Sequence, residues 1–359
     1  MQRIAVLYLA RLAEGIEHFE RFANSYRENP PGEPHDFYVI CKGELTQDAH
    51  TKIADVFRGI DHKVIEISDE GYDIQAYLKA AKKIENDDLC LFNTFSVLLS
   101  PNWLNKLANQ YQRPGVGIAG MTGSYESLRD SWEKLNKVIW LASTRQVRFD
   151  PRFADQFRVT LQTHVPDWLW AERSCYLRVR RIIGDAYHRR VAYNDHALEA
   201  RFATFWKKLC EEREDFAQVT KIAKFPNPHL RTNGFMISRN FFLEFQSMGN
   251  SKMDCMMFES GPDGLSSRVR NKGMEIILVG ANGIGYPVAD WVKSGTFRLD
   301  DHRNLMASDN QVAAFEKLTG LERKDLIRMT WGDYLEPPPK GLLDLGFDYP
   351  AVRRLTSIQ

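Results

Sequence analysis

The chain has 359 residues, with 48 Lys and Arg against 47 Asp and Glu and a formal net charge of +1. This length suits one large domain or two, and the balanced charge argues against a general nucleic-acid binder, which usually carries a basic excess. The five cysteines are scattered without metal-ligand spacing, which indicates core thiols in a reducing compartment. We see no signal peptide and no apolar run near the roughly 20 residues that span a bilayer, so we predict a cytoplasmic protein.

Strand and helix patterns alternate through the first 125 residues. Short apolar runs predict buried strands, and apolar residues at helical spacing predict helices between them. The predicted strands lie at 4–10, 36–41, 63–67, 89–93 and 116–119. This alternation is typical of an α/β fold with a mostly parallel sheet and helices on both faces.

The strand at 89–93 gives the first candidate site. It ends in small polar residues, Asn93 to Ser96, and ligands of open α/β sheets bind at the carboxyl ends of strands. Ser100 is predicted as the N-cap of the next helix and Pro101 as its first residue. The turn at Gly71 is expected to bring Asp73 to the same edge of the sheet as Asn93, although a capping role in a solvated loop remains an alternative.

The pattern changes between residues 127 and 224, where helical spacing dominates and no strand is predicted. Arginine and lysine alternate with aromatic residues over 172–209. This segment is predicted either to pack as a helical hairpin with a solvated basic face or to lie on an anionic membrane surface.

The α/β pattern returns after Pro226 and Pro228, with predicted strands at 235–238 and 275–279. The segment 280–286 is rich in glycine but contains neither a GxGxxG nor a Walker motif, which excludes both of those nucleotide-binding loops. A short helix and a proline-rich run end the chain. We therefore predict four parts: 1–126, a helical insertion at 127–224, 225–310, and a tail at 311–359.

Four segments together resemble the GT-A nucleotide-sugar glycosyltransferases, in particular bacterial relatives of glycosyltransferase family 2. The first strand and its helix look like the family's first nucleotide-binding unit. The segment 71–77 is similar to a Gly-x-Asp-Ile loop, and 90–96 with 101–104 stands where the family has Asp-x-Asp and the following helix. The segments 231–239 and 258–273 resemble the acceptor loop and the catalytic segment.

The resemblance implies a GT-A fold in which 1–126 is the nucleotide-sugar-binding half and 225–310 the acceptor and catalytic half. It also implies an inverting enzyme that moves a sugar from a nucleotide-sugar donor to a saccharide or lipid-linked acceptor in bacterial surface-polysaccharide synthesis. Such an enzyme needs one carboxylate to take the acceptor's proton and positive charge or hydrogen-bond donors on the diphosphate.

The resemblance assigns site residues in three groups. Glu259 is the candidate base, with Asp254 and Asp263 as alternatives, and helix capping is the competing role for Glu259. The donor-binding candidates are Ala10, Arg11, Asp73, Asn93, Thr94, Ser96, Arg231, Arg298 and His302. The acceptor-binding candidates are His229, Thr232 and Asn233, although His229 and His302 also fit ordinary loop histidines.

Asn93-Thr94-Phe95 departs from Asp-x-Asp and lacks the paired carboxylates that a hard cation such as Mg²⁺ prefers. We therefore assign no metal ligand, and a role for Mg²⁺ or Mn²⁺ stays open. The same departure supports an alternative function, an inactive GT-A domain that binds a nucleotide-sugar or glycan, or acts as a scaffold. A third alternative, a membrane-surface adaptor built on 172–209, leaves these motifs unexplained.

Overall fold

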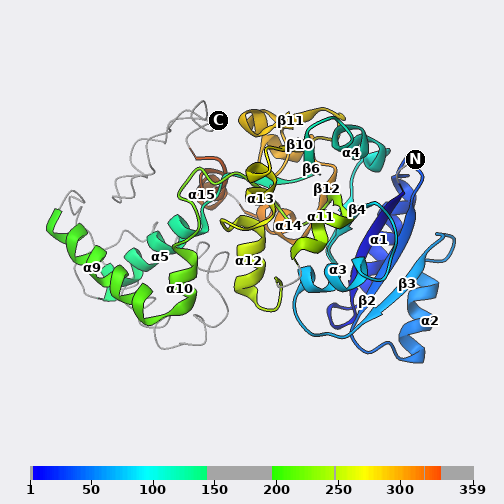
Figure 1. Cartoon of the computed structure of the whole chain (residues 1–359), viewed down its shortest axis with the longest axis horizontal. Coiled ribbons are helices and arrows are strands. Elements are labelled where there is room, and N and C mark those ends of the chain that lie inside the picture. The colour runs from blue at the N-terminus through cyan, green and yellow to red at the C-terminus, as the bar shows by residue number, and fades with distance from the viewer. Residues whose placement is uncertain (1–2, 144–195, 246–247, 319, 333–359) are drawn as a thin grey trace. The chain divides into compact units, whose positions relative to one another are not determined.

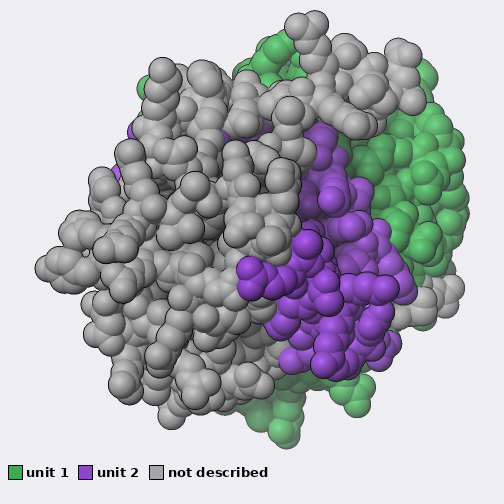
Figure 2. All heavy atoms as spheres, turned by 90° about the vertical axis from the view of Figure 1, so that its left-hand side faces the viewer, with its two compact units in different colours: residues 1–124, 228–317 green, residues 125–227, 318–359 purple. Residues whose placement is uncertain are grey.

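The computed structural model describes residues 3–143, 196–245, 248–318 and 320–332. The chain divides into two compact units (Figure 2), one of residues 1–124 and 228–317 and the other of 125–227 and 318–359. Among the described residues, no helix is both long and apolar enough to cross a membrane. The functions predicted for the segments 1–126, 127–224, 225–310 and 311–359 remain predictions.

The first unit is built on one eight-stranded sheet with the order β11-β10-β6-β9-β4-β1-β2-β3 (Figure 1). The strands are β1 Ile4–Arg11, β2 Asp36–Lys42, β3 Lys63–Ile67, β4 Asp88–Phe92, β6 Val116–Gly120, β9 Phe235–Ser238, β10 Glu275–Val279 and β11 Gly285–Pro287. β9 runs antiparallel to both β4 and β6, and β11 antiparallel to β10; the other neighbours are parallel. The prediction of an α/β fold with a mostly parallel sheet is confirmed, and all seven predicted strands lie in this sheet.

Helices pack on both faces of the sheet because its central strands are apolar on both sides. In β1, Val6, Tyr8 and Ala10 join the core formed with α1 (Ile16–Glu28), α2 (Gln47–Val56) and α4 (Trp103–Tyr111). The alternate residues of β1 point to the opposite face, where α3 (Asp73–Ala81) contacts β1, β2 and β3. β1 is therefore buried on both faces, as expected for a strand inside a parallel sheet.

Short elements complete both units. In the first unit these are the strand pairs β5 (Val97–Leu98) with β12 (Ala307–Ser308) and β7 (Gly123–Ser124) with β8 (His229–Leu230), and the helices α11 (Arg239–Phe242), α12 (Lys252–Ser260), α13 (Leu265–Asn271) and α14 (Asn310–Glu316). The described part of the second unit contains α5 (Leu128–Ser143), α9 (His196–Glu212), α10 (Glu214–Val219) and α15 (Gly320–Trp331). Of the basic segment 172–209, only residues 196–209 lie within the described part of the chain.

The predicted start of α4 is wrong. Its N-cap is Asn102, in a left-handed conformation with φ of 58°, and its first residue is Trp103. Ser100 instead accepts a hydrogen bond from Lys106 Nζ at 2.8 Å. The cause is a distant loop: Pro30 O accepts from Asn102 N, and Pro31 O accepts from the N–H groups of Leu104 and Asn105. These carbonyls satisfy helix-start donors that a local side-chain cap would otherwise serve.

Asp88 is buried at the start of β4, where Tyr111 donates a hydrogen bond to its Oδ1 at 3.0 Å and Oδ2 has no partner among the described residues. Burial raises the pKa of this carboxyl. Since the folded state holds the proton more tightly than the unfolded state, Asp88 costs stability as the pH rises through its folded pKa.

We therefore expect the stability of Asp88→Asn, which keeps the acceptor for Tyr111, to rise relative to wild type as the pH increases above the unfolded-state pKa near 4. Urea unfolding of both proteins at several pH values measures this difference. A difference in unfolding free energy that does not change with pH would contradict the assignment. Asp87→Asn, one residue earlier in the chain, serves as a control.

Candidate functional site

The sheet order places a switch point between β1 and β4. After β1 the chain adds β2 and β3 on one side, and it then returns to add β4 on the other side. Ligands of open α/β sheets bind outside the carboxyl ends of the strands at such a point. Here those ends carry Arg11 and the turn Asn93 to Ser96. The turn is attached to β1, because Arg11 N donates to Thr94 Oγ1 at 3.4 Å and Tyr8 OH to Thr94 O at 2.9 Å.

The side chain of Asn93 closes the turn that follows β4. Its Oδ1 accepts a hydrogen bond from Phe95 N at 3.0 Å and lies 3.1 Å from Ser96 Oγ, whose single proton is shared with Asn233 Oδ1. The ring of Phe95 packs edge-on against His18, with centroids 4.7 Å apart. An asparagine that binds its own backbone two residues on is a common way to fix a tight turn. The turn is therefore ordered by its own hydrogen bonds and by its contacts with β1 and α1.

Asn233 joins this turn to the segment between β8 and β9. Its Oδ1 accepts from Asn93 N at 3.1 Å and from Ser96 Oγ at 2.6 Å. The next residue, Gly234, has a φ of 66°, and its N–H donates to Leu91 O at 2.8 Å. This conformation suits glycine. The acceptor-side candidate Asn233 and the donor-side candidates Asn93 and Ser96 thus form one hydrogen-bonded group.

Glu259 is attached to the same segment from the last turn of α12. Its Oε2 accepts from Thr232 N at 2.9 Å and from Thr232 Oγ1 at 2.8 Å. Its Oε1 lies 3.9 Å from His229 Nε2 and accepts no hydrogen bond from the described residues. Since Thr232 precedes Asn233, two consecutive residues connect Glu259 to the turn after β4.

The two alternative carboxylates lie in other surroundings. Asp254 forms a capping box with Ser251 at the start of α12, where its Oδ2 accepts from Ser251 N at 2.9 Å. Asp263 is exposed in the turn before α13. Helix capping, the competing role considered for Glu259, is therefore the role of Asp254.

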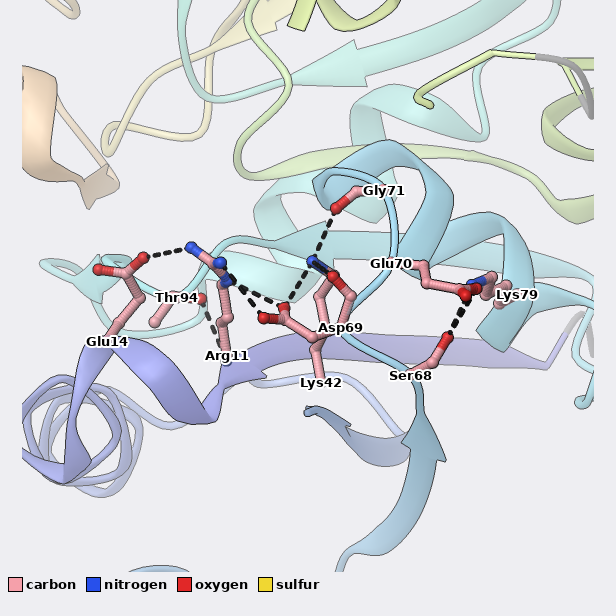
Figure 3. A network of polar contacts seen from close by, with 9 residues as sticks. All are labelled: Arg11, Glu14, Lys42, Ser68, Asp69, Glu70, Gly71, Lys79 and Thr94. Atoms are coloured by element: carbon pink, nitrogen blue, oxygen red, sulfur yellow. Dashed lines mark hydrogen bonds and ion pairs between the residues drawn. The ribbon is translucent and has the colours of Figure 1, made fainter. Parts of the chain in front are cut away.

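A network of charged side chains lies beside the switch point (Figure 3). Arg11 contacts Glu14 at 2.8 Å and Asp69 at 3.1 Å, and Lys42 Nζ contacts Asp69 Oδ1 at 2.9 Å and Gly71 O at 2.8 Å. The Lys42 side chain is 2% exposed. Hydrogen bonds from Arg11 and then from Lys42 lower the pKa of Asp69.

Sequence reasoning did not select Lys42 or Asp69. Their positions could have indicated them. Lys42 directly follows the predicted strand 36–41, and Asp69 lies two residues after the predicted strand 63–67, at the edge of the sheet that carries Arg11. Asp73, which was selected, is the first residue of α3 and is exposed at the surface. Desolvation by the protein around it nevertheless raises the pKa of Asp73, against the opposing charges of Lys252, Lys42 and Arg11.

The remaining donor-side candidates make other contacts. Arg231 pairs with buried Asp309 at 2.9 Å, and its guanidinium lies 4.2 Å from the ring centroid of Phe297. His302 is buried, accepts from Arg298 N at 2.9 Å and contacts Glu316 at 3.1 Å. Their predicted role at the diphosphate stays a prediction.

The guanidinium of Arg298 packs on the same ring of Phe297, 4.7 Å from its centroid. The side chain of Ala10 is buried in the core, together with residues of α1, α2 and α4.

The residues at the switch point do not fit a divalent cation. The side-chain oxygen of Asn93 already accepts a hydrogen bond from Phe95 N, and Phe95 offers no side-chain ligand atom. Across the described ranges, no group of three His, Cys, Asp or Glu residues could hold a metal ion. Hard cations require several oxygen ligands at once. We therefore derive no step through a metal.

No protein-family model and no curated protein matches the chain. Among solved structures it is similar to the mannosyltransferase PcManGT of Pyrobaculum calidifontis in complex with GDP-Man and Mn²⁺ (14% identity, 37% of this chain, 38% of that chain, TM-score 0.29). It is also similar to residues 1–349 of TarS from S. aureus (12%, 33%, 34%, 0.27).

A third similar structure is glucosyl-3-phosphoglycerate synthase of Mycobacterium tuberculosis with Mn²⁺, UDP and glucosyl-3-phosphoglycerate (12% identity, 33% of this chain, 43% of that chain, TM-score 0.27). The chain thus covers less than half the length of each of these three proteins. Because these three TM-scores are below 0.5, the α/β fold is assigned from the sheet topology.

Proposed function

We propose that this protein is a nucleotide-sugar glycosyltransferase of the GT-A type. One observation carries the proposal: three hydrogen bonds, Arg11 N to Thr94 Oγ1, Asn93 N to Asn233 Oδ1 and Thr232 N to Glu259 Oε2, tie β1, the turn after β4 and the segment before β9 to the carboxylate of Glu259. This group lies at the β1–β4 switch point, where an α/β sheet binds its ligand. A carboxylate beside a ligand site is what sugar transfer to a hydroxyl requires.

In the proposed reaction Glu259 is the base. Thr232 holds Oε2 with two hydrogen bonds and fixes the carboxylate, so Oε1 is the oxygen that would take the proton of the acceptor hydroxyl. The acceptor oxygen would then attack the anomeric carbon as the nucleoside diphosphate leaves, which inverts the configuration. A saccharide or lipid-linked acceptor, synthesis of bacterial surface polysaccharide and contact with the inner membrane through 172–209 belong to the same proposal.

The second candidate function is a GT-A domain that binds a nucleotide-sugar or glycan without turnover. The uncharged sequence Asn93-Thr94-Phe95 favours it, because no paired carboxylates stand there. Hydrolysis of the donor distinguishes the two functions. An active transferase slowly transfers its sugar to water, whereas a binding module shows donor affinity and no sugar release.

We expect a panel of nucleoside diphosphates and nucleotide-sugars to contain a ligand that raises the melting temperature by about 5 °C at 100 times its Kd. Since the site lacks paired carboxylates, this shift should persist in EDTA. Thermal unfolding with and without EDTA, followed by added Mn²⁺, measures both. A shift that disappears on chelation and returns with Mn²⁺ would contradict metal-independent binding.

A further inference from the structure

The amide of Asn233 has one polar end that is fully used and one that is not. Its Oδ1 accepts from Asn93 N and Ser96 Oγ, and the residue is 3% exposed. Because a backbone N–H can only donate, the atom facing Asn93 N must be the oxygen, and the orientation of the amide follows. Its nitrogen Nδ2 has no hydrogen-bond partner among the described residues.

An amide of this kind is expected to have a partner. Most buried polar groups are hydrogen-bonded, and an unmade bond destabilises the protein. The hydroxyls of Tyr77 and Thr122 are fully buried and have no hydrogen-bond partner among the described residues. Nδ2 of Asn233, in contrast, is accessible to solvent. It also belongs to the group at the switch point, where a ligand is expected. A ligand oxygen bound there can replace water as its partner.

The backbone around Asn233 is held in place before any ligand binds. Arg231 N donates to Thr122 O at 3.0 Å, Thr232 N to Glu259 Oε2 at 2.9 Å, and Gly234 N to Leu91 O at 2.8 Å. A Cβ at Gly234 would lie 2.8 Å from Met121 Sδ, so the turn is also tightly packed. A fixed donor binds without first having to be ordered.

The hydrogen-bonding capacity of Asn233 and the charge around it favour one kind of ligand oxygen. With Oδ1 occupied, Asn233 offers donors only, and a phosphoryl oxygen accepts only, whereas a sugar hydroxyl both donates and accepts. The adjoining turn, Asn93 to Ser96, carries no carboxylate, and the carboxylate of Glu259 accepts two hydrogen bonds from Thr232, which offset part of its charge. Both facts favour an anionic oxygen over a hydroxyl.

We propose that Asn233 donates its amide N–H to a diphosphate oxygen of the nucleotide-sugar. This inference rests on the proposed function and moves Asn233 from the acceptor side to the donor side of the site. Asn233 would then stabilise the leaving diphosphate in a site without a metal, by donating to the charge that develops as the glycosidic bond breaks.

Asn233→Asp is the informative substitution, because it is isosteric and retains an acceptor for Asn93 N and Ser96 Oγ. It replaces the donor by a second carboxylate oxygen. A diphosphate loses a hydrogen bond and gains repulsion, so we expect UDP or GDP, whichever binds wild type, to bind at least about 100-fold more weakly. Asn233→Ala, which adds no charge but removes both the donor and the acceptor for Asn93 N and Ser96 Oγ, should weaken binding roughly 10-fold.

Calorimetry with UDP and GDP measures these affinities, and thermal unfolding identifies variants that fold. Asn109→Asp makes the same change on the exposed surface of α4 and should bind as wild type does. Unchanged diphosphate affinity in Asn233→Asp would overturn the inference alone; if that variant does not fold, unchanged affinity in Asn233→Ala has the same force. Wild type that binds neither nucleotide, nor any other nucleoside diphosphate, would overturn the proposed function and the inference with it.

Discussion

Glu259→Gln should lower the rate of sugar transfer about 10²- to 10⁴-fold, the usual loss when one positioned base is removed. Glutamine keeps a side-chain oxygen that can accept from Thr232 N and Oγ1, so the segment before β9 should remain in place. It cannot take a proton at neutral pH. We therefore expect donor affinity and melting temperature to stay close to those of wild type, while turnover collapses.

Asp254→Asn and Asp263→Asn are the matched controls. Asp254 caps α12, so its substitution should cost ~1 kcal/mol of stability and little activity. Asp263 is exposed, and its substitution should change neither. Normal turnover in Glu259→Gln beside an inactive control would show that the base is misassigned. A wild-type protein that binds a donor and never releases sugar would favour the binding module.

The second large effect is expected at Lys42. Asp69→Asn would leave the buried Lys42 ammonium with carbonyl acceptors alone, and removing one partner of a buried ion pair typically costs 3–5 kcal/mol. Because the Asp69 side chain is 43% exposed, water screens part of this loss. We expect Asp69→Asn to lower the free energy of unfolding by roughly 2 kcal/mol at pH 7, measured by urea titration.

Two further measurements identify the cause. The double variant Asp69→Asn/Lys42→Met should be more stable than Asp69→Asn, since it removes the unpaired charge as well. The lowered pKa of Asp69 stabilises the fold above the unfolded-state pKa near 4, and this contribution is lost as the pH falls through the folded-state pKa. The deficit of Asp69→Asn should therefore shrink toward pH 3. A deficit that is the same at both pH values would point to a packing defect.

The sequence predicted the strands well because their signal is local. The apolar runs of β1 and β4 each read as a strand buried on both faces, and both are. The sequence could not predict contacts between residues that are far apart in the chain. Pro30 and Pro31 supply acceptors to α4, and Asp69 pairs with Lys42, but nothing within either segment signals its partner.

The candidate site, too, was predictable only where its signal is local. Asn93, Thr94 and Ser96 could be selected because they follow a predicted strand, and the group that contains Glu259 was assigned by resemblance. The amide orientation of Asn233 could not be predicted, since it depends on Asn93 N and Ser96 Oγ, which precede it by 140 and 137 residues. Only the folded chain brings these atoms together.

The antiparallel strand β9 has a consequence for how the chain is made. β9 separates β4 from β6, and it belongs to a stretch that leaves the ribosome more than a hundred residues after either of them. Until then β4 and β6 each present an unpaired edge, the kind of surface through which nascent chains associate wrongly. Since residues 231–234 immediately precede β9, the pairing that covers these edges also brings Asn233 to the turn after β4. Glu259 and β10 follow later still in the chain, so the candidate site and the sheet would both be completed late in synthesis.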